Sequence, residues 1–437
     1  MRIDYLVSPG GALVGKVRVP GDKSISHRAV MLGSIAEGET YVKGFLEAED
    51  ALATLSAFRQ MGVTVERPSP GELIIHGVGR HGLKAPAEPL YLGNSGTSMR
   101  LLCGLLCGQP FDSILTGDAS LSRRPMRRVT EPLKKMGAAI ETTPEGTAPI
   151  RIFGGRKLTG IHYQMPVASA QVKSALLLAG LYAEGETCVL EPAPTRDHTE
   201  RMLEGFGYRV LREGNRVCLE GGGKLIGRDL DVPADISSAA FFLVGASIAA
   251  GSEVLLEHVG VNPTRTGVIE ILRLMGAKIE LLHPREVGGE PVADLKVAYA
   301  PLHGIRIPEE LVPLAIDEFP VLFIAAACAE GETVLSGAAE LRVKESDRIQ
   351  VMAEGLNTLG VDARATPDGM IIRGGRIGSG RVDSHGDHRI AMAFAIAALA
   401  AQGPIEIQDC ANVATSFPSF AHLARHLGLR LEVVQRV

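Results

Sequence analysis

Apolar residues in this chain recur in a helix-like phrase that ends in glycine and is followed by a short strand-like run. Six copies of the phrase read FRQMGVTVE, LKKMGAAIE, LEGFGYRVL, LRLMGAKIE, LNTLGVDAR and, more loosely, ARHLGLRLE. Their glycines stand at positions 62, 137, 207, 276, 360 and 428. Each copy predicts an amphipathic helix that ends at a C′ glycine and leads into a strand. The regular spacing indicates six repeated units of about 70 residues.

A second, more apolar helix precedes every copy of this phrase. These helices read AVMLGSIA, MRLLCGLL, SALLLAGLYA, SAAFFLVGASIAA, VLFIAAACA and IAMAFAIAALAA. Because they are apolar almost all round, they must be buried by the rest of their own domain. We therefore expect an α/β protein with two domains, each with three sheets around a bundle of buried helices. A doubly wound, Rossmann-like sheet is less favoured, since no GxGxxG stands between a predicted strand and a helix.

Chain length and charge limit the possible classes of protein. The 437 residues exceed what one hydrophobic core holds, so two domains of about 200 residues are expected. The formal net charge of −5 gives no reason to expect nucleic acid or an anionic membrane as a partner. The start MRIDYLVSPGG has no apolar signal core, and runs such as 390–401 are shorter than the ~20 residues needed to cross a bilayer.

The cysteines and histidines predict neither disulfides nor a metal site. The six cysteines form no CxxC pair, so buried, reduced thiols are expected at 103, 107, 188, 218, 328 and 410. Reduced thiols and the missing export signal favour the cytoplasm. No HExxH occurs, and His385 and His388 lack further ligands nearby in the sequence.

Polar segments stand directly before the six apolar helices, and they combine capping residues with cations. They are residues 21–28 (GDKSISHR), 93–98 (GNSGTS), 168–171 (ASAQ), 234–238 (ADISS), 316–318 (IDE) and 385–389 (HGDHR). Capping accounts for Ser, Asn and Asp at a helix start, but not for Lys23, Arg28 or Arg389. Free N–H groups and the dipole of a buried helix start attract anions, and nearby cations strengthen the attraction. Several such starts would form a binding site for a polyanion.

Two basic runs fit the same interpretation. They are LSRRPMRR at 121–128 and LRVKESDR at 341–348. Each run alone is as compatible with a solvated surface. In the second run, Lys344 and Arg348 are four residues apart and would share a helix face, with Glu345 beside them.

Taken together, these segments resemble the 5-enolpyruvylshikimate-3-phosphate (EPSP) synthase family. The motifs GDKSISHR, LGNSGTSMR, DASLSRRPM, SAQVK, RDHTE, NPTRTG, DEFP, LRVKESDR, DHRIAM and TSFP occur in order between Pro20 and Pro418. The resemblance implies the enolpyruvyl transferase fold, in which two domains of three βαβαββ units each, inverse α/β barrel-like, close over a central cleft. It implies one domain of residues 21–233 and another of residues 1–20 with 234–437.

The resemblance also implies a reaction and a set of site residues. The family transfers the enolpyruvyl group of phosphoenolpyruvate to the 5-hydroxyl of shikimate 3-phosphate by addition and elimination, without cofactor or metal. Asp317 would accept the hydroxyl proton, Glu345 would protonate the methylene carbon, and Lys23 would assist the charge changes. Shikimate 3-phosphate, mainly on the 21–233 domain, would contact Lys23, Ser24, Arg28, Ser169, Gln171, Arg196, Asp317 and Lys344. Phosphoenolpyruvate, mainly on the other domain, would contact Lys23, Gly96, Arg124, Gln171, Arg348 and Arg389.

Three positions bear on how this chain differs from some family members. Thr415 stands where they have a lysine, so one expected cation for phosphoenolpyruvate is missing, and Glu340 stands where they have an asparagine. Gly96 leaves room for the inhibitor glyphosate, although one branch of the family often has alanine there, so tolerance stays open. We expect a cytoplasmic monomer that binds small-molecule substrates and glyphosate, with no nucleic-acid or membrane partner.

Two other functions fit part of the pattern. UDP-N-acetylglucosamine enolpyruvyl transferase shares the fold but uses a loop cysteine ahead of an Arg-Pro, and residues 118–125 (DASLSRRP) contain none. A non-catalytic anion-binding protein would use the same cleft for sensing. Release of phosphate from phosphoenolpyruvate with shikimate 3-phosphate distinguishes the first function from both.

Overall fold

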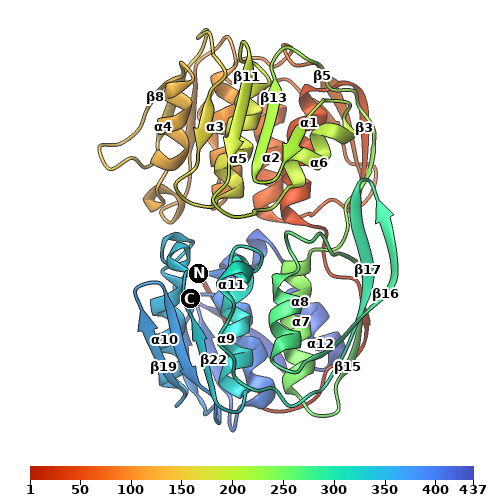
Figure 1. Cartoon of the computed structure of the whole chain (residues 1–437). Coiled ribbons are helices and arrows are strands. Elements are labelled where there is room, and N and C mark those ends of the chain that lie inside the picture. Colours follow the sequence, from red (N-terminus) through yellow and green to blue (C-terminus); the bar gives the residue numbers. More distant parts are fainter. The chain divides into compact units, whose positions relative to one another are not determined.

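The chain forms two compact units in a computed structural model that describes all 437 residues. Unit 1 consists of Met1–Pro20 with Pro233–Val437, and unit 2 consists of Gly21–Val232. The bounds differ by one residue from those that the resemblance implies. The two ends of the chain meet in unit 1, where β1 (Arg2–Val7) pairs with β23 (Leu431–Arg436) (Figure 1). No helix is both long and apolar enough to cross a membrane.

Unit 2 contains three four-stranded sheets with one repeated topology. Its strands are β3 (Glu37–Lys43), β4 (Thr64–Glu66), β5 (Leu73–Val78), β6 (Leu90–Tyr91), β7 (Ser113–Thr116), β8 (Ala139–Glu141), β9 (Ile150–Phe153), β10 (His162–Gln164), β11 (Glu186–Leu190), β12 (Leu211–Glu213), β13 (Arg216–Glu220) and β14 (Asp229–Asp231). The sheet orders are β6-β7-β9-β8, β10-β11-β13-β12 and β14-β3-β5-β4. In each order the first two strands are parallel, and the other neighbours are antiparallel.

Unit 1 repeats this topology. Besides β1 and β23, its strands are β2 (Val14–Val17), β15 (Glu253–Gly260), β16 (Lys278–Val287), β17 (Glu290–Ala298), β18 (Glu332–Leu335), β19 (Asp362–Thr366), β20 (Gly369–Arg373), β21 (Gly380–Asp383) and β22 (Ile405–Gln408). Two sheets read β2-β15-β17-β16 and β21-β22-β1-β23, and the third is β18-β20-β19. Parallel bridges from His303 and Arg306 to the β18 segment stand where the third sheet would have its first strand.

Strand pairing explains why the chain enters and leaves unit 2 where it does. The first strand of one unit 2 sheet, β14, comes from the end of that unit and pairs with β3 near its beginning. In unit 1, β1 and β2 come from the N-terminus and complete sheets that the C-terminal part leaves short. Backbone hydrogen bonds fix both crossing points, with Val232 N–H donating to Lys43 at 2.8 Å and Asp235 N–H donating to Pro20 at 2.8 Å.

The twelve α-helices alternate between buried and amphipathic, as the two phrases predict. They are α1 (Lys23–Ile35), α2 (Glu49–Gln60), α3 (Gly96–Cys107), α4 (Arg127–Lys135), α5 (Ala170–Gly180), α6 (His198–Gly205), α7 (Ile236–Ile248), α8 (Gly267–Leu274), α9 (Phe319–Cys328), α10 (Arg348–Thr358), α11 (His388–Ala397) and α12 (Phe420–Leu427). The odd-numbered helices are buried almost throughout their length. The even-numbered helices bury one face, and the glycine after each has a positive φ, as a C′ glycine requires.

Each unit has its own hydrophobic core, built on its buried helices. In unit 1, α7, α9 and α11 contact one another, and each contacts strands of a sheet. In unit 2, α3 and α5 lie so close that a Cβ at Gly104 would stand 2.0 Å from the carbonyl oxygen of Ala175. The glycine therefore sets the distance between these two helices.

The expectation of six reduced cysteines is wrong for one pair. Cys188 and Cys218 are joined by a disulfide, although 30 residues separate them in the sequence. Antiparallel pairing of β11 with β13 places the two residues directly opposite each other, which no local motif reveals. The other four are free thiols, as expected, and burial raises the pKa of Cys103 and Cys328 to about 12.

Gly104→Ala tests the close contact of α3 and α5. The added methyl group meets a backbone oxygen that cannot turn aside, and overpacking of this kind destabilises by about 1–3 kcal/mol. We expect a lower melting temperature in circular dichroism, which suits a chain without tryptophan. Gly375→Ala is the control, because a Cβ there meets no atom within 4 Å. Equal melting of the two variants would contradict the close contact.

Candidate active site

The residues expected to bind substrate fall into two groups, one in each unit. In unit 2 they lie at or near the starts of buried helices α1, α3 and α5, and they are Lys23, Ser24, Arg28, Gly96, Arg124, Ser169, Gln171 and Arg196. In unit 1 they lie near the starts of α9, α10 and α11, and they are Asp317, Lys344, Glu345, Arg348 and Arg389. Within each unit, the residues expected at the site thus lie at or near helix starts.

The start of α1 brings together three of the expected residues. Asp22 caps the helix by accepting a hydrogen bond from the Ile25 N–H at 2.9 Å. Lys23 Nζ lies 3.3 Å from Asp50 Oδ2 on α2. Ser24 Oγ accepts a hydrogen bond from Arg196 Nη1 at 3.2 Å. Two cations and a hydroxyl group therefore surround this helix start, which agrees with an anion site.

Arg28 lies one turn further into α1 and braces three helices. Its Nε donates to Thr199 Oγ1 at 2.7 Å, its Nη1 to the Ser24 carbonyl at 2.8 Å, and its Nη2 to Ser174 Oγ at 3.0 Å. These partners belong to α6, α1 and α5, and the residue is only 4% exposed. These three hydrogen bonds fix the position of the guanidinium group inside unit 2.

A chain of hydrogen bonds, absent from the sequence prediction, joins the starts of α1 and α3. His27 Nδ1 lies 2.8 Å from Thr54 Oγ1, which lies 2.6 Å from Ser98 Oγ. Ser98 Oγ in turn lies 2.7 Å from Ser95 Oγ, the cap of α3. Burial holds the pKa of His27 well below its usual value, and the nearby charges of Lys23 and Arg28 lower it further. The ring is therefore neutral and acts as a structural link.

The start of α3 gathers Gly96, Arg124 and Gln171. A Cβ on Gly96 would lie 2.9 Å from Arg124 Nη1 and 3.0 Å from Arg100 Nη1. Gln171, from α5, accepts a hydrogen bond from Arg100 Nη1 at 2.6 Å and donates one to Thr97 at 2.9 Å. Glycine at position 96 therefore allows two guanidinium groups to approach the helix start.

Arg100 is a member of this group that the sequence prediction missed. It stands in the apolar run MRLLCGLL, four residues after Gly96, so both lie on one face of α3. Its second nitrogen, Nη2, donates to the Pro125 carbonyl at 3.3 Å. A single arginine in an otherwise apolar buried helix was the available signal.

The basic run at 121–128 contains both a buried residue expected at the site and residues exposed to solvent. Arg124 is 5% exposed, and its Nη2 donates to Asn94 Oδ1 at 2.9 Å. Asn94 is itself held by Asp118, whose Oδ2 accepts from Asn94 Nδ2 at 3.0 Å. Arg123 and Arg127 are exposed, so the solvated interpretation holds for them.

In unit 1, the guanidinium of Arg348 joins three carboxylates. Its Nε and Nη2 donate to Asp387 at 2.9 and 3.2 Å, its Nη2 also donates to Glu345 at 2.8 Å, and its Nη1 donates to Asp317 at 3.4 Å. The side chain is fully buried. Burial alone would lower the pKa of Arg348, but Asp387, Glu345 and Asp317 together raise it above its usual value. Arg348 is therefore a permanent cation that holds both expected acid–base residues.

Two local expectations about this group are wrong. Lys344 and Arg348 do not share a helix face, because Asp347 caps α10 and starts the helix only at Arg348. The two cations meet instead through Asp317, whose Oδ1 lies 3.6 Å from Lys344 Nζ. Nor is Asp317 a helix cap, since α9 starts without a side-chain cap and Asp317 lies in the 3-10 helix Ile316–Glu318 before it.

Arg389 stands near the start of α11 and differs from the other cations. The residue is 6% exposed, and its guanidinium makes no hydrogen bond or ion pair with the protein. Its backbone N–H donates to Asp387, the cap of α11, at 3.1 Å. A buried cation without a protein partner is costly unless an anion binds to it.

Thr415, where some family members have a lysine, serves a structural purpose in this chain. The residue is buried, and its hydroxyl group donates to the Asn412 carbonyl at 2.6 Å. Asn412 Nδ2 in turn donates to the Gly386 carbonyl at 2.7 Å, in the loop before α11. Thr415 thus supports the segment that positions Arg389.

Comparisons of this chain with known proteins identify its family. A model of the family EPSP synthase (3-phosphoshikimate 1-carboxyvinyltransferase) matches residues 7–423. This chain belongs to the EPSP synthase family. The match covers both units and all the helix starts described above, so the doubly wound alternative is excluded.

Members of the EPSP synthase family resemble this chain over its whole length. The 3-phosphoshikimate 1-carboxyvinyltransferase of Methylococcus capsulatus is 74% identical over 429 residues, which are 98% of each chain. That of Alkalilimnicola ehrlichii is 71% identical over 430 residues, 98% of this chain and 96% of the other. The solved structure of EPSP synthase from Acinetobacter baumannii is 61% identical, covers 100% of both chains and superposes with a TM-score of 0.88. The structural match shows the enolpyruvyl transferase fold. The names of the relatives favour EPSP synthase activity over that of UDP-N-acetylglucosamine enolpyruvyl transferase.

Asp387→Asn tests how much the buried ion pair stabilises unit 1. Asparagine still caps α11, but removing one charge of a buried pair costs about 3–5 kcal/mol. We expect faster hydrogen–deuterium exchange in peptides from α10 and α11, measured by mass spectrometry.

The control for this substitution is Asp347→Asn at the cap of α10. Asp347 pairs with Arg342 at 2.8 Å, and both side chains are about one-third exposed. An exposed pair of this kind contributes only about 0–1 kcal/mol. Similar exchange rates in the two variants would show that the ion pair between Arg348 and Asp387 contributes little to the stability of unit 1.

Proposed function

We propose that this member of the EPSP synthase family transfers the enolpyruvyl group of phosphoenolpyruvate to the 5-hydroxyl of shikimate 3-phosphate, releasing phosphate. Arg389 is the observation that carries the proposal of an anionic substrate in unit 1, because its buried guanidinium has no partner in the protein. Phosphoenolpyruvate offers a phosphate and a carboxylate, and an arginine fork binds either with two hydrogen bonds. The family match supports the choice of this substrate.

Shikimate 3-phosphate is proposed to bind mainly to unit 2. Lys23 and Arg196 supply positive charge beside the start of α1, and Arg28 adds charge from one turn below. Two hydroxyl groups remain able to donate, because Ser24 accepts from Arg196 and Ser169 accepts from the Val172 N–H at 3.3 Å. The group combines cations for the phosphate with donors for a carboxylate or hydroxyl. Gln171 of unit 2, with Asp317 and Lys344 of unit 1, completes the proposed set.

The residues proposed for phosphoenolpyruvate come from both units. Unit 2 supplies Lys23, Gly96, Arg124 and Gln171, and unit 1 supplies Arg348 and Arg389. Unit 1 would thus contribute most of the acid–base chemistry and part of the phosphoenolpyruvate site. Lys23 is proposed to stabilise charge on the departing phosphate.

The ion pairs of unit 1 suggest how the two carboxyl groups act. Asp317 faces both Lys344 and Arg348, so it is ionised and able to accept the proton of the 5-hydroxyl as that oxygen attacks. Glu345 would protonate the methylene carbon in the same step, giving a tetrahedral adduct. Loss of a methyl proton to Glu345 and of phosphate, which takes the proton held by Asp317, then gives the product and returns both carboxyl groups to their starting states.

Glu345 needs a proton before the addition step, and its ion pair with Arg348 opposes protonation. The two groups are 2.8 Å apart, an arrangement that favours the carboxylate. We propose that an anionic group of phosphoenolpyruvate competes for Arg348 and so releases Glu345 to bind a proton. Binding of phosphoenolpyruvate would then convert Glu345 into the protonated acid that the addition step requires.

Three further properties belong to the proposal. Glyphosate is proposed as an inhibitor, because glycine at position 96 lets Arg124 approach the helix start without hindrance. A cytoplasmic location is proposed on the four free thiols, which suit a reducing compartment, and a monomeric state is proposed with it.

The direct test of this function is phosphate release from phosphoenolpyruvate. We expect release with shikimate 3-phosphate and none with UDP-N-acetylglucosamine. Arg389→Ala is expected to raise KM for phosphoenolpyruvate by about 10–100-fold, because hydrogen bonds to charged groups contribute about 1.5–3 kcal/mol. Arg376→Ala, an exposed arginine of the same unit, is the control. Release only with the nucleotide sugar would indicate the sister enzyme, and no release with either acceptor would leave a binding protein.

Glu345→Gln tests the proposed acid. The amide keeps its shape but cannot protonate carbon, so kcat should fall by about 10²–10⁴-fold while KM for phosphoenolpyruvate changes much less. In deuterated water, the variant should also lose deuterium incorporation at the methylene carbon, which mass spectrometry detects. Glu354→Gln, on the exposed face of α10, should behave as the unchanged protein. A variant that retained kcat would remove Glu345 from the mechanism.

A further inference from the structure

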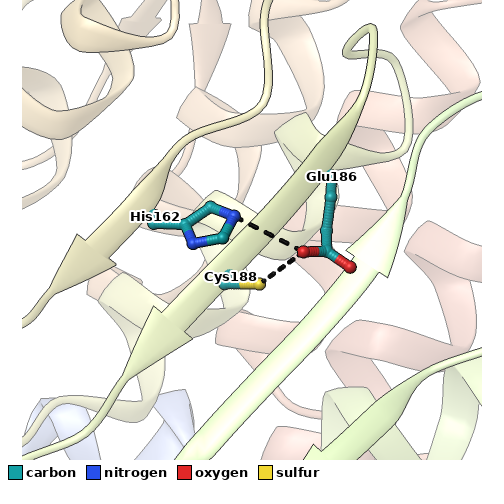
Figure 2. A group of neighbouring side chains, drawn as sticks. All are labelled: His162, Glu186 and Cys188. Carbon is teal, nitrogen blue, oxygen red and sulfur yellow. Dashed lines mark hydrogen bonds and ion pairs between the residues drawn. The ribbon is translucent and has the colours of Figure 1, made fainter.

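Three potential metal ligands meet on the sheet β10-β11-β13-β12 of unit 2. They are His162 on β10 and Glu186 and Cys188 on β11 (Figure 2). Their ligand atoms, one from each side chain, all lie within 4.8 Å of one another. None of these residues belongs to the candidate active site.

Strand register explains why the three side chains converge. His162 is the direct partner of Cys188 in the parallel pairing of β10 with β11, so the two share a face of the sheet. Glu186 precedes Cys188 by two residues and therefore points to the same side. The intervening Thr187 is fully buried, whereas the side chains of His162 and Glu186 are 62% and 42% exposed. The group thus lies on the face of the sheet that carries these exposed side chains, although Cys188 itself is only 3% exposed.

Both neighbours of Glu186 contact the same carboxylate oxygen. His162 Nε2 lies 3.4 Å and Cys188 Sγ lies 3.2 Å from Glu186 Oε1 (Figure 2). Zinc bonds of about 2.0–2.3 Å in a tetrahedral site place neighbouring ligand atoms roughly 3.3–3.7 Å apart. The two observed distances are close to that spacing, so a bound ion would require only small side-chain movements.

The redox state of Cys188 decides whether its sulfur can act as the third metal ligand. In the disulfide with Cys218, the sulfur has neither a proton to donate nor the negative charge of a thiolate, the form of cysteine that binds metals. Reduction by a phosphine adds two electrons and two protons to the sulfur–sulfur bond, while the phosphine takes oxygen from one water. The product is two thiols, and Cys188 can then donate to Glu186 or lose its proton.

We propose that the reduced chain binds a zinc-like divalent cation through His162 Nε2, Glu186 Oε1 and the Cys188 thiolate, and that the Cys188–Cys218 disulfide abolishes this site. Binding releases the thiol proton to solvent, and a water molecule takes the fourth position. Nitrogen, sulfur and carboxylate ligands together suit zinc better than magnesium or calcium, which prefer oxygen alone. The site is separate from the active site and does not depend on the proposed function.

A guanidinium group now occupies part of the space that the ion would take. Arg216 Nη2 lies 3.3 Å from Cys188 Sγ and 4.0 Å from Glu186 Oε1. The Arg216 side chain is 45% exposed, so it can turn into solvent when the ion binds. Removing this competing charge should therefore strengthen metal binding.

Access to the bond is provided by a surface hollow of about 440 Å³ beside the disulfide. Glu186 and Cys218 both line it, together with residues of β12 and the segment around Tyr208. A small reductant or oxidant can therefore approach Cys218 from solvent. Although Cys218 is only 6% exposed, its place in the wall of this hollow fits a disulfide that forms and breaks, the usual kind in a reducing compartment.

Cobalt titration of the full-length protein tests the proposal. One sample is reduced with a phosphine and one is oxidised with diamide, which accepts two electrons and two protons, and mass spectrometry verifies both states. We expect the reduced protein to show a thiolate-to-cobalt charge-transfer band and the visible bands of four-coordinate cobalt. Added zinc should displace the cobalt, and the oxidised protein should show no such band.

Substitutions then identify the ligands. Cys188→Ser should abolish the charge-transfer band, and His162→Ala should weaken binding at least about tenfold, since even outer-shell partners of a metal contribute about 10–100-fold. Arg216→Ala should tighten binding, which general damage to the sheet would not do. Phosphate release from phosphoenolpyruvate should be unchanged in all three variants.

The matched control is His76→Ala in another sheet of unit 2. His76 contacts Glu39 at 3.3 Å and Glu66 at 2.9 Å through opposite ring nitrogens, so these groups cannot share one ion, and no cysteine is nearby. This variant should bind cobalt like the unchanged protein. The proposal is overturned by a reduced protein without the band, by a band that survives Cys188→Ser, or by equal binding in the oxidised protein.

Discussion

Burial of six apolar helices is the constraint on which the rest of this structure depends. A helix such as α7, whose sequence is ISSAAFFLVGASI, has no face that tolerates water and must be covered on every side. Each unit solves this with three buried helices, three sheets and a second set of amphipathic helices. Many of the polar residues of the buried helices lie at their starts, where caps such as Asp22 and Asp387 satisfy the first N–H groups. The helix starts suit chemistry because their first N–H groups have no partner within the helix and can bind a polar side chain or an anion.

Cations at the helix starts are stabilised to different degrees, and the differences have functional meaning. Arg348 is neutralised by carboxylates, whereas Arg389 has no protein partner. A neutralised cation costs little to bury, but an incoming anion must compete for it. A cation without a partner costs more and binds an anion without competition. One group therefore combines a buried cation without a protein partner and a cation whose charge three carboxylates neutralise.

The solvent face of the sheets is a second chemical environment, governed by strand pairing. On β11, alternate residues face the core and the solvent, so Thr187 and Val189 pack inward while Glu186 and Cys188 face outward. Register then places His162 on one side of Cys188 and Cys218 on the other. A cysteine sulfur, an imidazole and a carboxylate meet there without any sequence motif, because each comes from alternation within a strand or from pairing between strands.

The sequence by itself determined the repeats, the buried helices and the residues at their starts. Those features depend on local periodicity and capping, which neighbouring residues decide, so the C′ glycines and caps such as Ser95 and Ser169 are found where the pattern predicts them. The family motifs lie in the same segments. Only the tertiary structure decided contacts between residues distant in the chain. It joined Arg100 to Gln171, placed Asp317 beside Lys344, and bonded Cys188 to Cys218. Such contacts depend on which helices pack together and on the register of strands, and no local pattern encodes either.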